Sequence, residues 1–356
     1  MSRFDQQIRF ASTANGAKIA YATSGHGYPL VRAGHWMTHL QWDWQSVWGP
    51  WIQAMAAHRQ LIRYDQRGCG LSPATTDSSS LETMLQDLEA VVDDAKLDKF
   101  ALVGPSQGGA VSIAYAAKHP ERVTHLVLCD AFARGALVRD PGPKRREVVE
   151  AMCCLVEEGW GQPNSAFRQM FTSQFFPMAS REQAESFNEL QRLSCPPAHA
   201  AALMRALAAV DASPYLPEVR CPTLVLHCRG DSRVPFEEGQ FIAARIPGAQ
   251  LEVLESSNHT PLQGEPAFDR LLKSMDEFLP ATTAGSGVPG FAGLSDRDRE
   301  IVELLARGLD NSQIAAHLGL AEKTVRNRVS DTFRILAVEN RSQAIVRARE
   351  AGFGSS

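Results

Sequence analysis

The sequence lacks long apolar runs and any pairing pattern among its cysteines. No stretch of about 18 or more apolar residues occurs, and residues 1–7 contain no apolar signal core. We therefore expect no membrane partner and no export. The seven cysteines are odd in number and include no CxxC motif, which is typical of free, mostly buried thiols in a reducing cytoplasm.

Metal-ligand patterns and a strong charge imbalance are also missing. The histidines do not stand at ligand spacing with cysteines or acidic residues, so we expect no metal and no cofactor. The net charge of −4 confines any nucleic-acid site to a local patch of the surface. A chain of 356 residues corresponds to about two domains, and it shows no internal repeat.

Short apolar stretches alternate with helical patterns through residues 1–280. The turn at Asn15-Gly16 predicts an N-terminal β-hairpin. Further strands are expected at 30–33, 59–64, 100–103, 123–129, 223–228 and 250–255, and helices at 81–94 and 108–118. This alternation predicts a doubly wound α/β fold with a mostly parallel sheet. Residues of about 132–215 break the alternation and are expected to form an inserted helical lid.

A serine occupies a sharp turn between a predicted strand and a predicted helix. Residues 104–108 read Gly-Pro-Ser-Gln-Gly, after the apolar run 100–103 and before the small-residue helix 110–117. A G-x-S-x-G pattern in this setting is typical of a nucleophile elbow, whose glycines avoid clashes with the adjoining strand and helix. We therefore predict that Ser106 is a nucleophile.

A serine nucleophile needs a base and an acid that orients the base. His259 follows the last predicted strand and is the candidate base. Asp231 follows strand 223–228 and is the favoured acid, while Asp130, which follows strand 123–129, is the alternative. The order Ser, Asp, His is the order in which elbow-type hydrolases carry their triad.

Residues 65–72, Asp-Gln-Arg-Gly-Cys-Gly-Leu-Ser, resemble the D-x-R-G-x-G-x-S loop of α/β-hydrolases. Together with the elbow and the triad, the resemblance covers roughly residues 15–280. It implies an oxyanion hole made by the backbone N–H groups of Trp36 and Gln107. The aromatic segment 35–44 is either a wall of the ligand pocket or packing of a long loop. Pocket candidates from this segment and the lid region are His35, Met37, Phe132, Trp160 and Phe175.

Residues 281–292 contain few large apolar residues and are expected to be a linker. Residues 293–356 are wholly helical in pattern. Short helices at 311–318 and about 321–336, joined at Gly319-Leu320, predict a helix-turn-helix. One side of the second of these helices carries Val325, Val329, Phe333 and Leu336, and the opposite side is polar and basic.

This C-terminal part resembles the LuxR-type helix-turn-helix family in Leu294-Ser295, Ile314-Ala315, in 322–327 and in Arg341 with Gln343-Ala344. The resemblance implies binding to double-stranded DNA, and the family's last helix commonly carries a dimer contact. DNA-contacting candidates on the polar side are Lys323, Thr324, Arg326, Asn327, Ser330 and Arg334. Two residues depart from the pattern: Ala321 replaces the usual Ser or Thr cap, and Ala337 stands where Gly is common.

The combination of a hydrolase-like part and a LuxR-type tail resembles a group of bacterial fusion regulators. Three hypotheses follow. The first is a homodimeric, cytoplasmic transcription regulator in which a small apolar effector, an ester or a lactone, controls DNA binding. The second is an active serine esterase with an appended DNA-binding domain. The third is a constitutive DNA-binding dimer whose large part only dimerises.

Overall fold

The computed structural model describes residues 6–74, 79–280, 291 and 294–354. These residues form a large unit built on a β-sheet and a small unit built of helices. Most of the predicted linker, residues 281–290 and 292, lies outside the described residues, as does residue 293.

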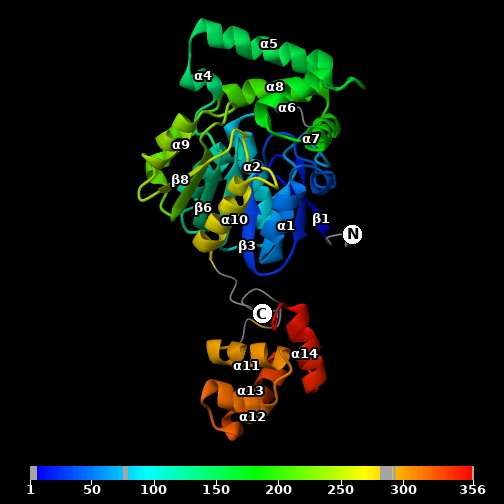
Figure 1. Cartoon of the computed structure of the whole chain (residues 1–356), viewed down its shortest axis with the longest axis vertical. Coiled ribbons are helices and arrows are strands. Elements are labelled where there is room, and N and C mark those ends of the chain that lie inside the picture. Colours follow the sequence, from blue (N-terminus) through cyan, green and yellow to red (C-terminus); the bar gives the residue numbers. More distant parts are fainter. Residues whose placement is uncertain (1–5, 75–78, 281–290, 292–293, 355–356) are drawn as a thin grey trace. The chain divides into compact units, whose positions relative to one another are not determined.

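The large unit is built on an eight-stranded sheet in the order β1-β2-β4-β3-β5-β6-β7-β8 (Figure 1). The strands are β1 (Gln7–Ser12), β2 (Lys18–Ser24), β3 (Tyr28–Arg32), β4 (Arg59–Tyr64), β5 (Phe100–Pro105), β6 (Val123–Cys129), β7 (Thr223–Cys228) and β8 (Gln250–Leu254). β1 and β2 form the expected antiparallel hairpin, and Gly16 takes a φ of 86° in its turn. Successive neighbours from β5 to β8 pair in parallel, as β3 does with β5. The mostly parallel α/β fold expected from the sequence is therefore confirmed.

Helices cover the sheet: α1 (Gly49–Ala57), α2 (Leu81–Asp94), α3 (Gly108–Lys118), α9 (Phe236–Ala243) and α10 (Pro266–Phe278). A short 3-10 helix, η1 (Asp43–Gln45), precedes α1. Ser80 begins α2 with a capping box, and the buried side of this helix includes Leu88 and Val91. α1 and α10 lie side by side in Figure 1, and the rings of Trp51 and Phe268 meet between them at 6.4 Å. The predicted ranges of α2 and α3 agree with the structure.

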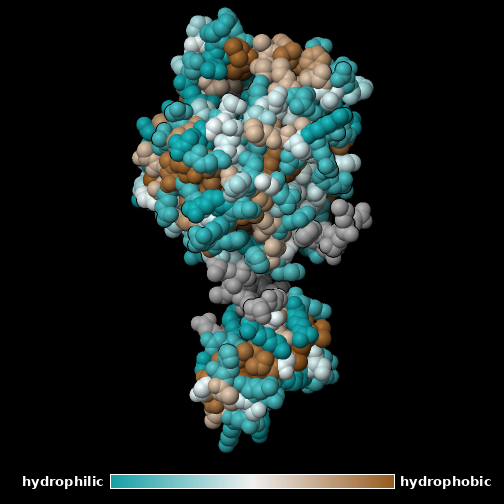
Figure 2. All heavy atoms as spheres, viewed as in Figure 1, coloured by the Kyte–Doolittle hydropathy of each residue, from teal (hydrophilic) through white to brown (hydrophobic). Residues whose placement is uncertain are grey.

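A group of helices lies between β6 and β7 in the chain: α4 (Ala136–Arg139), α5 (Pro143–Gly159), α6 (Ala166–Phe175), α7 (Arg181–Ser194) and α8 (Pro197–Ala209), followed by the 3-10 helix η2 (Ser213–Glu218). We call α4–α8 the lid. It lies together at one end of the large unit in Figure 1. Figure 2 shows hydrophobic atoms at its surface, and its exposed apolar side chains include Val148, Phe167 and Met178.

The small unit consists of α11 (Asp296–Ala306), α12 (Asn311–Leu318), α13 (Glu322–Ile335) and α14 (Arg341–Glu350). Ser295 and Asp310 begin α11 and α12 with capping boxes, and Gly319 ends α12 at a φ of 64°. Phe291, which the sequence placed in the linker, stacks on Phe353 at 5.2 Å in the core of this unit. It is therefore a core residue of the helical unit, because an aromatic ring this size gains most when buried.

Candidate active site and DNA-binding face

Ser106 stands at the end of β5 in a strained backbone conformation. Its φ is 49°, and its N–H donates to the carbonyl of Cys129 at 3.0 Å. A Cβ on Gly104 would lie 2.6 Å from Ser112 Oγ, and one on Gly108 would lie 2.9 Å from the carbonyl oxygen of Gly34. The glycines therefore allow the strand, the turn and α3 to approach closely enough to present the serine, as the elbow pattern predicted.

Asp231 and His259 form a buried hydrogen-bonded pair. His259 Nδ1 donates to Asp231 Oδ2 at 2.7 Å, and both residues are less than a tenth exposed. Asp231 Oδ1 accepts the backbone N–H groups of Arg233 at 2.7 Å and Val234 at 3.0 Å. Since a carboxylate only accepts, the pair fixes the proton of neutral His259 on Nδ1 and leaves Nε2 as an acceptor. Within the described residues, Nε2 has no hydrogen-bond partner.

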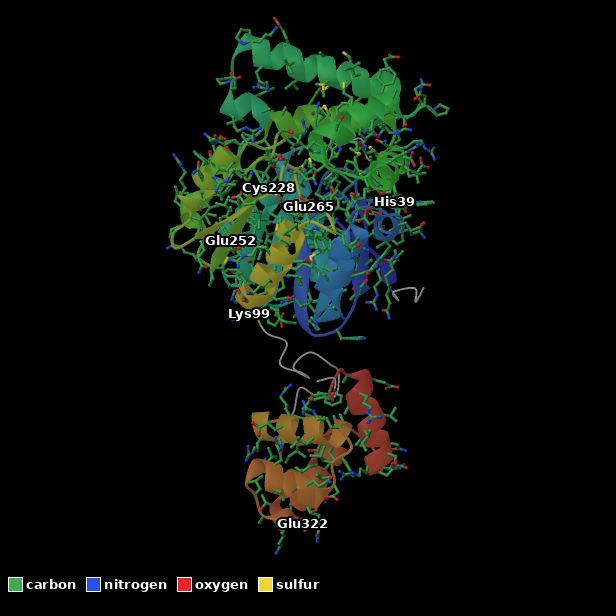
Figure 3. All side chains as sticks on the ribbon, viewed as in Figure 1. His39, Lys99, Cys228, Glu252, Glu265 and Glu322 are labelled. Carbon is green, nitrogen blue, oxygen red and sulfur yellow. The ribbon has the colours of Figure 1, made fainter. Side chains whose placement is uncertain are left out.

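Asp130, the alternative acid, has another partner. Its Oδ1 accepts the backbone N–H of Cys228, the last residue of β7, at 2.7 Å. Figure 3 labels Cys228 in the part of the large unit nearest the lid. Burial, and secondarily the charge of Asp231, raise the pKa of Asp130 well above its ordinary value. Asp231 is therefore the carboxylate that hydrogen-bonds the histidine, whereas Asp130 hydrogen-bonds the backbone of β7.

Asp130, His227 and Asp231 place one possible ligand atom each within 4.8 Å of one another, a cluster that the sequence did not indicate. Asp130 follows β6, whereas His227 and Asp231 lie in and just after β7, so the pairing of these two strands brings the three together. However, His227 Nε2 bonds the carbonyl of Val234 at 3.0 Å, and both oxygens of Asp231 already accept hydrogen bonds. Asp130 Oδ2 and His227 Nδ1 have no hydrogen-bond partner among the described residues. Because Asp231 is committed to His259, however, the three residues do not offer three free ligands, and the set does not fit a metal ion.

A cavity of about 250 Å³ opens beside Ser106 under the lid. Trp36 and Gln107, the predicted oxyanion residues, line it together with Ser106. In the described part of the chain, neither of their backbone N–H groups donates to an acceptor. Unpaired N–H groups next to the nucleophile are what an oxyanion hole requires.

The predicted pocket residues divide into two sets. Phe132 and Phe175 line the cavity, whereas His35, Met37 and Trp160 do not. These three are at most 1% exposed and pack inside the large unit. Trp160 donates to the carbonyl of Gln191 at 2.9 Å, for example. Their assignment to the pocket is therefore corrected to packing, the alternative left open for the aromatic loop.

Lid and catalytic loops are hydrogen-bonded to each other at the end of α6. The N–H of His259 donates to the carbonyl of Phe175 at 2.6 Å, and the rings of these residues are 5.4 Å apart. Glu265 holds the same loop, because its Oε1 accepts Asn258 Nδ2 at 2.7 Å and the N–H of Leu262 at 2.6 Å. Glu265 belongs to no motif in the sequence, where its place six residues after the histidine is the one feature that sets it apart.

The polar side of α13 lies open to solvent. All six DNA-contacting candidates are exposed, whereas Val325 and Val329 are buried and Arg328 joins Asp298 of α11 at 2.8 Å. Figure 3 labels Glu322, the first residue of α13, at the outer edge of the small unit. It pairs with Arg326 at 2.8 Å. A basic, exposed helix after a tight turn has the form of a recognition helix.

Comparison with known proteins identifies both parts. Residues 26–266 match the family model described as alpha/beta hydrolase fold. The chain belongs to this family. Residues 292–348 match the model for bacterial regulatory proteins of the luxR family. The protein is therefore a DNA-binding regulator that carries a hydrolase-like domain, and among its described residues no helix is long and apolar enough to cross a bilayer.

Individual relatives of the hydrolase domain are enzymes by name. A putative carbamate hydrolase RutD from Variovorax paradoxus is 30% identical over 260 residues, 68% of this chain and 90% of that protein. An esterase from Exiguobacterium antarcticum superposes with a TM-score of 0.64 at 23% identity, over 76% of this chain and 99% of its own. An enol-lactonase from Burkholderia xenovorans LB400 gives 0.63 at 22%, over 76% and 99%. At these identities the two structures establish the fold alone.

Proposed function

We propose that the hydrolase domain is a sensor that binds a small ester or lactone beside Ser106 and thereby controls DNA binding by α13. The observation that carries this proposal is the lid cavity, which is lined by Ser106, Trp36 and Gln107. Phe175 also lines the cavity, and its ring lies 5.4 Å from the ring of His259. A ligand in the cavity would touch both the lid and the catalytic loops. Such a ligand would change DNA affinity only if its binding free energies for two conformations of the protein differed, by a few kcal/mol.

A second candidate function is ester hydrolysis itself, which the formed Asp231–His259 pair favours. Ser106 would attack a carbonyl carbon, His259 would take the serine proton and pass it to the leaving group, and water would then release the acyl group. The backbone N–H groups of Trp36 and Gln107 would hold the oxyanion. Hydrolysis would in this case return the sensor to its unliganded state.

A fluorophosphonate probe separates the two functions. We expect stoichiometric labelling of the wild-type chain, read by intact mass, and none in Ser106→Ala. Absence of labelling in a folded wild type would contradict an active triad and leave a receptor that binds without turnover.

We also propose that the regulator binds DNA as a homodimer, since one helix-turn-helix unit buries little surface on DNA. Val346 of α14 is 56% exposed, although it is apolar. Val346→Asp should weaken dimers in sedimentation velocity. A monomeric wild type would contradict the proposal.

A further inference from the structure

The lid cavity is lined by positive charge without any acidic side chain. Arginines 139, 145 and 233 stand among its lining residues, and no aspartate or glutamate of the described chain lines it. The remaining wall is largely apolar, with Phe132, Phe175, Val149 and Met204 among its members. A pocket for a purely apolar molecule has no need of guanidinium groups, because burying a charge costs free energy unless it is paired.

The arginines near the cavity differ in their partners. Arg145 pairs with Asp140 at 3.2 Å, and the neighbouring Arg134 pairs with Glu238 at 2.8 Å. Within the described residues, Arg139 and Arg233 have no carboxylate at ion-pair distance. In the described part of the chain, Arg139 donates to the backbone carbonyl of Arg134 at 2.6 Å and lies 5.9 Å from the ring centroid of Phe132.

Arg233 lies where a ligand bound at Ser106 would meet it. Its guanidinium carbon is 5.1 Å from the ring centroid of Phe175, the residue whose ring and carbonyl contact His259. Burial lowers the pKa of Arg233, and the charge of Arg139 lowers it further. The charge of Asp231 opposes this lowering, although within the described residues no oxygen of Asp231 lies at ion-pair distance from Arg233. Around this part of the cavity, four arginines at positions 134, 139, 145 and 233 outnumber the three carboxylates at positions 140, 231 and 238, so positive charge is in excess.

We infer that the effector carries an anionic group, a carboxylate or a phosphate, which Arg139 and Arg233 hold while its ester or lactone carbonyl lies at Ser106. This inference rests on the proposed sensor function and replaces the purely apolar effector expected from the sequence. Guanidinium forks match both anions in geometry. The cavity of about 250 Å³ is below the range of about 300–1,000 Å³ typical of drug-sized ligands, so the effector is a small molecule.

Matched pairs of esters test the inference. The full-length Ser106→Ala chain, which cannot hydrolyse them, is titrated with monomethyl and dimethyl esters of succinate, glutarate and adipate. We expect at least one monomethyl ester to bind at least about tenfold more tightly than its neutral dimethyl partner, the loss expected when charge-assisted hydrogen bonds are missing. Methyl 4-phosphonobutanoate, titrated beside monomethyl glutarate, distinguishes a phosphate site from a carboxylate site.

Substitutions in the same background assign the effect to the two arginines. Arg139→Gln and Arg233→Gln should each remove the preference for the charged ester. Arg229→Gln is the matched control. Arg229 lies four residues before Arg233 in the loop after β7, but it pairs with Glu255 at 3.0 Å and does not line the cavity. Equal binding of charged and neutral esters, binding of neither, or unchanged preference in both variants would overturn the inference.

Labelling of the wild-type chain by the fluorophosphonate probe, run in parallel, keeps the two proposals apart. Labelling of Ser106 without any preference for charged esters removes the anionic effector and leaves an ester site. Preference for charged esters that depends on both arginines, without labelling, supports the anion site in a receptor that does not turn its ligand over.

Discussion

Asp231 Oδ2 accepts a hydrogen bond from His259 Nδ1 at 2.7 Å, and this contact joins the loops that follow β7 and β8. Asp130, at the end of the neighbouring strand β6, bonds a backbone N–H of β7 in its place. Two buried carboxyl groups thus lie close together, but only Asp231 orients the histidine.

Asp231→Asn should slow fluorophosphonate labelling of Ser106 by roughly 10³–10⁴-fold, because an amide can favour the wrong tautomer of His259. Asp130→Asn should leave the rate nearly unchanged, since the amide oxygen can still accept the Cys228 N–H. Labelling rates followed by intact mass give both numbers. If Asp130→Asn slowed labelling as much as Asp231→Asn, the assignment of the acid would have to be exchanged.

Asp65 should make the large domain less stable as pH rises. Burial, and secondarily the charge of Asp43, raise the pKa of Asp65 from 3.8 to about 7. Between these pH values the Asp65 carboxyl group therefore keeps its proton in the folded state and has lost it in the unfolded state. The contribution of Asp65 to the free energy of unfolding consequently falls as pH rises from about 4 to 7. Asp65→Asn should remove this contribution, which amounts to roughly 2–4 kcal/mol.

Urea unfolding followed by tryptophan fluorescence measures this effect, because all six tryptophans lie between Trp36 and Trp160 in the large domain. The difference in unfolding free energy between wild type and Asp65→Asn should change by the stated amount across this pH range. Asp269→Asn removes an exposed carboxyl group from α10 and serves as the control. A pH-independent difference would show that Asp65 is ionised in the fold throughout.

The exposed side of α13 should account for sequence-specific DNA binding. Arg326→Ala with Asn327→Ala should weaken binding to a DNA site selected from a random library by about 1–3 kcal/mol for each lost base contact. Arg307→Ala is the control, as this arginine pairs with Glu303 on α11, at 2.9 Å. Electrophoretic shifts at fixed salt measure both. Unchanged binding by the double variant would place the DNA contact on another surface.

Ala337 is strained at the end of α13. Its φ is 51°, in the left-handed region that glycine occupies without cost. Ala337→Gly should therefore stabilise the small domain, by about 1 kcal/mol. Ala316→Gly, an exposed position within α12, should destabilise it by about the same amount. Amide hydrogen exchange of α11–α14 in the full chain reports both changes, and slower exchange in Ala316→Gly than in Ala337→Gly would refute the strain.

The sequence by itself determined the local features. The G-x-S-x-G glycines, the caps Ser295 and Gly319, and the polar side of α13 each act within a few residues, so they are visible in the order of the chain. The strain at Ala337 followed in the same way from a single departure from the family pattern. Periodicity predicted α2 and α3, since an amphipathic or a uniformly apolar helix is recognisable without its partners.

Only the tertiary structure decided which distant residues meet. It joined Asp231 rather than Asp130 to His259, because strand order and the direction of each loop settle which carboxyl group reaches the ring. It buried His35, Met37 and Trp160 and placed Arg139 and Arg233 at the cavity, since the side of a loop or a lid helix that faces inward depends on what packs against it. The charge of the pocket, and with it the class of effector, is a property of that packing.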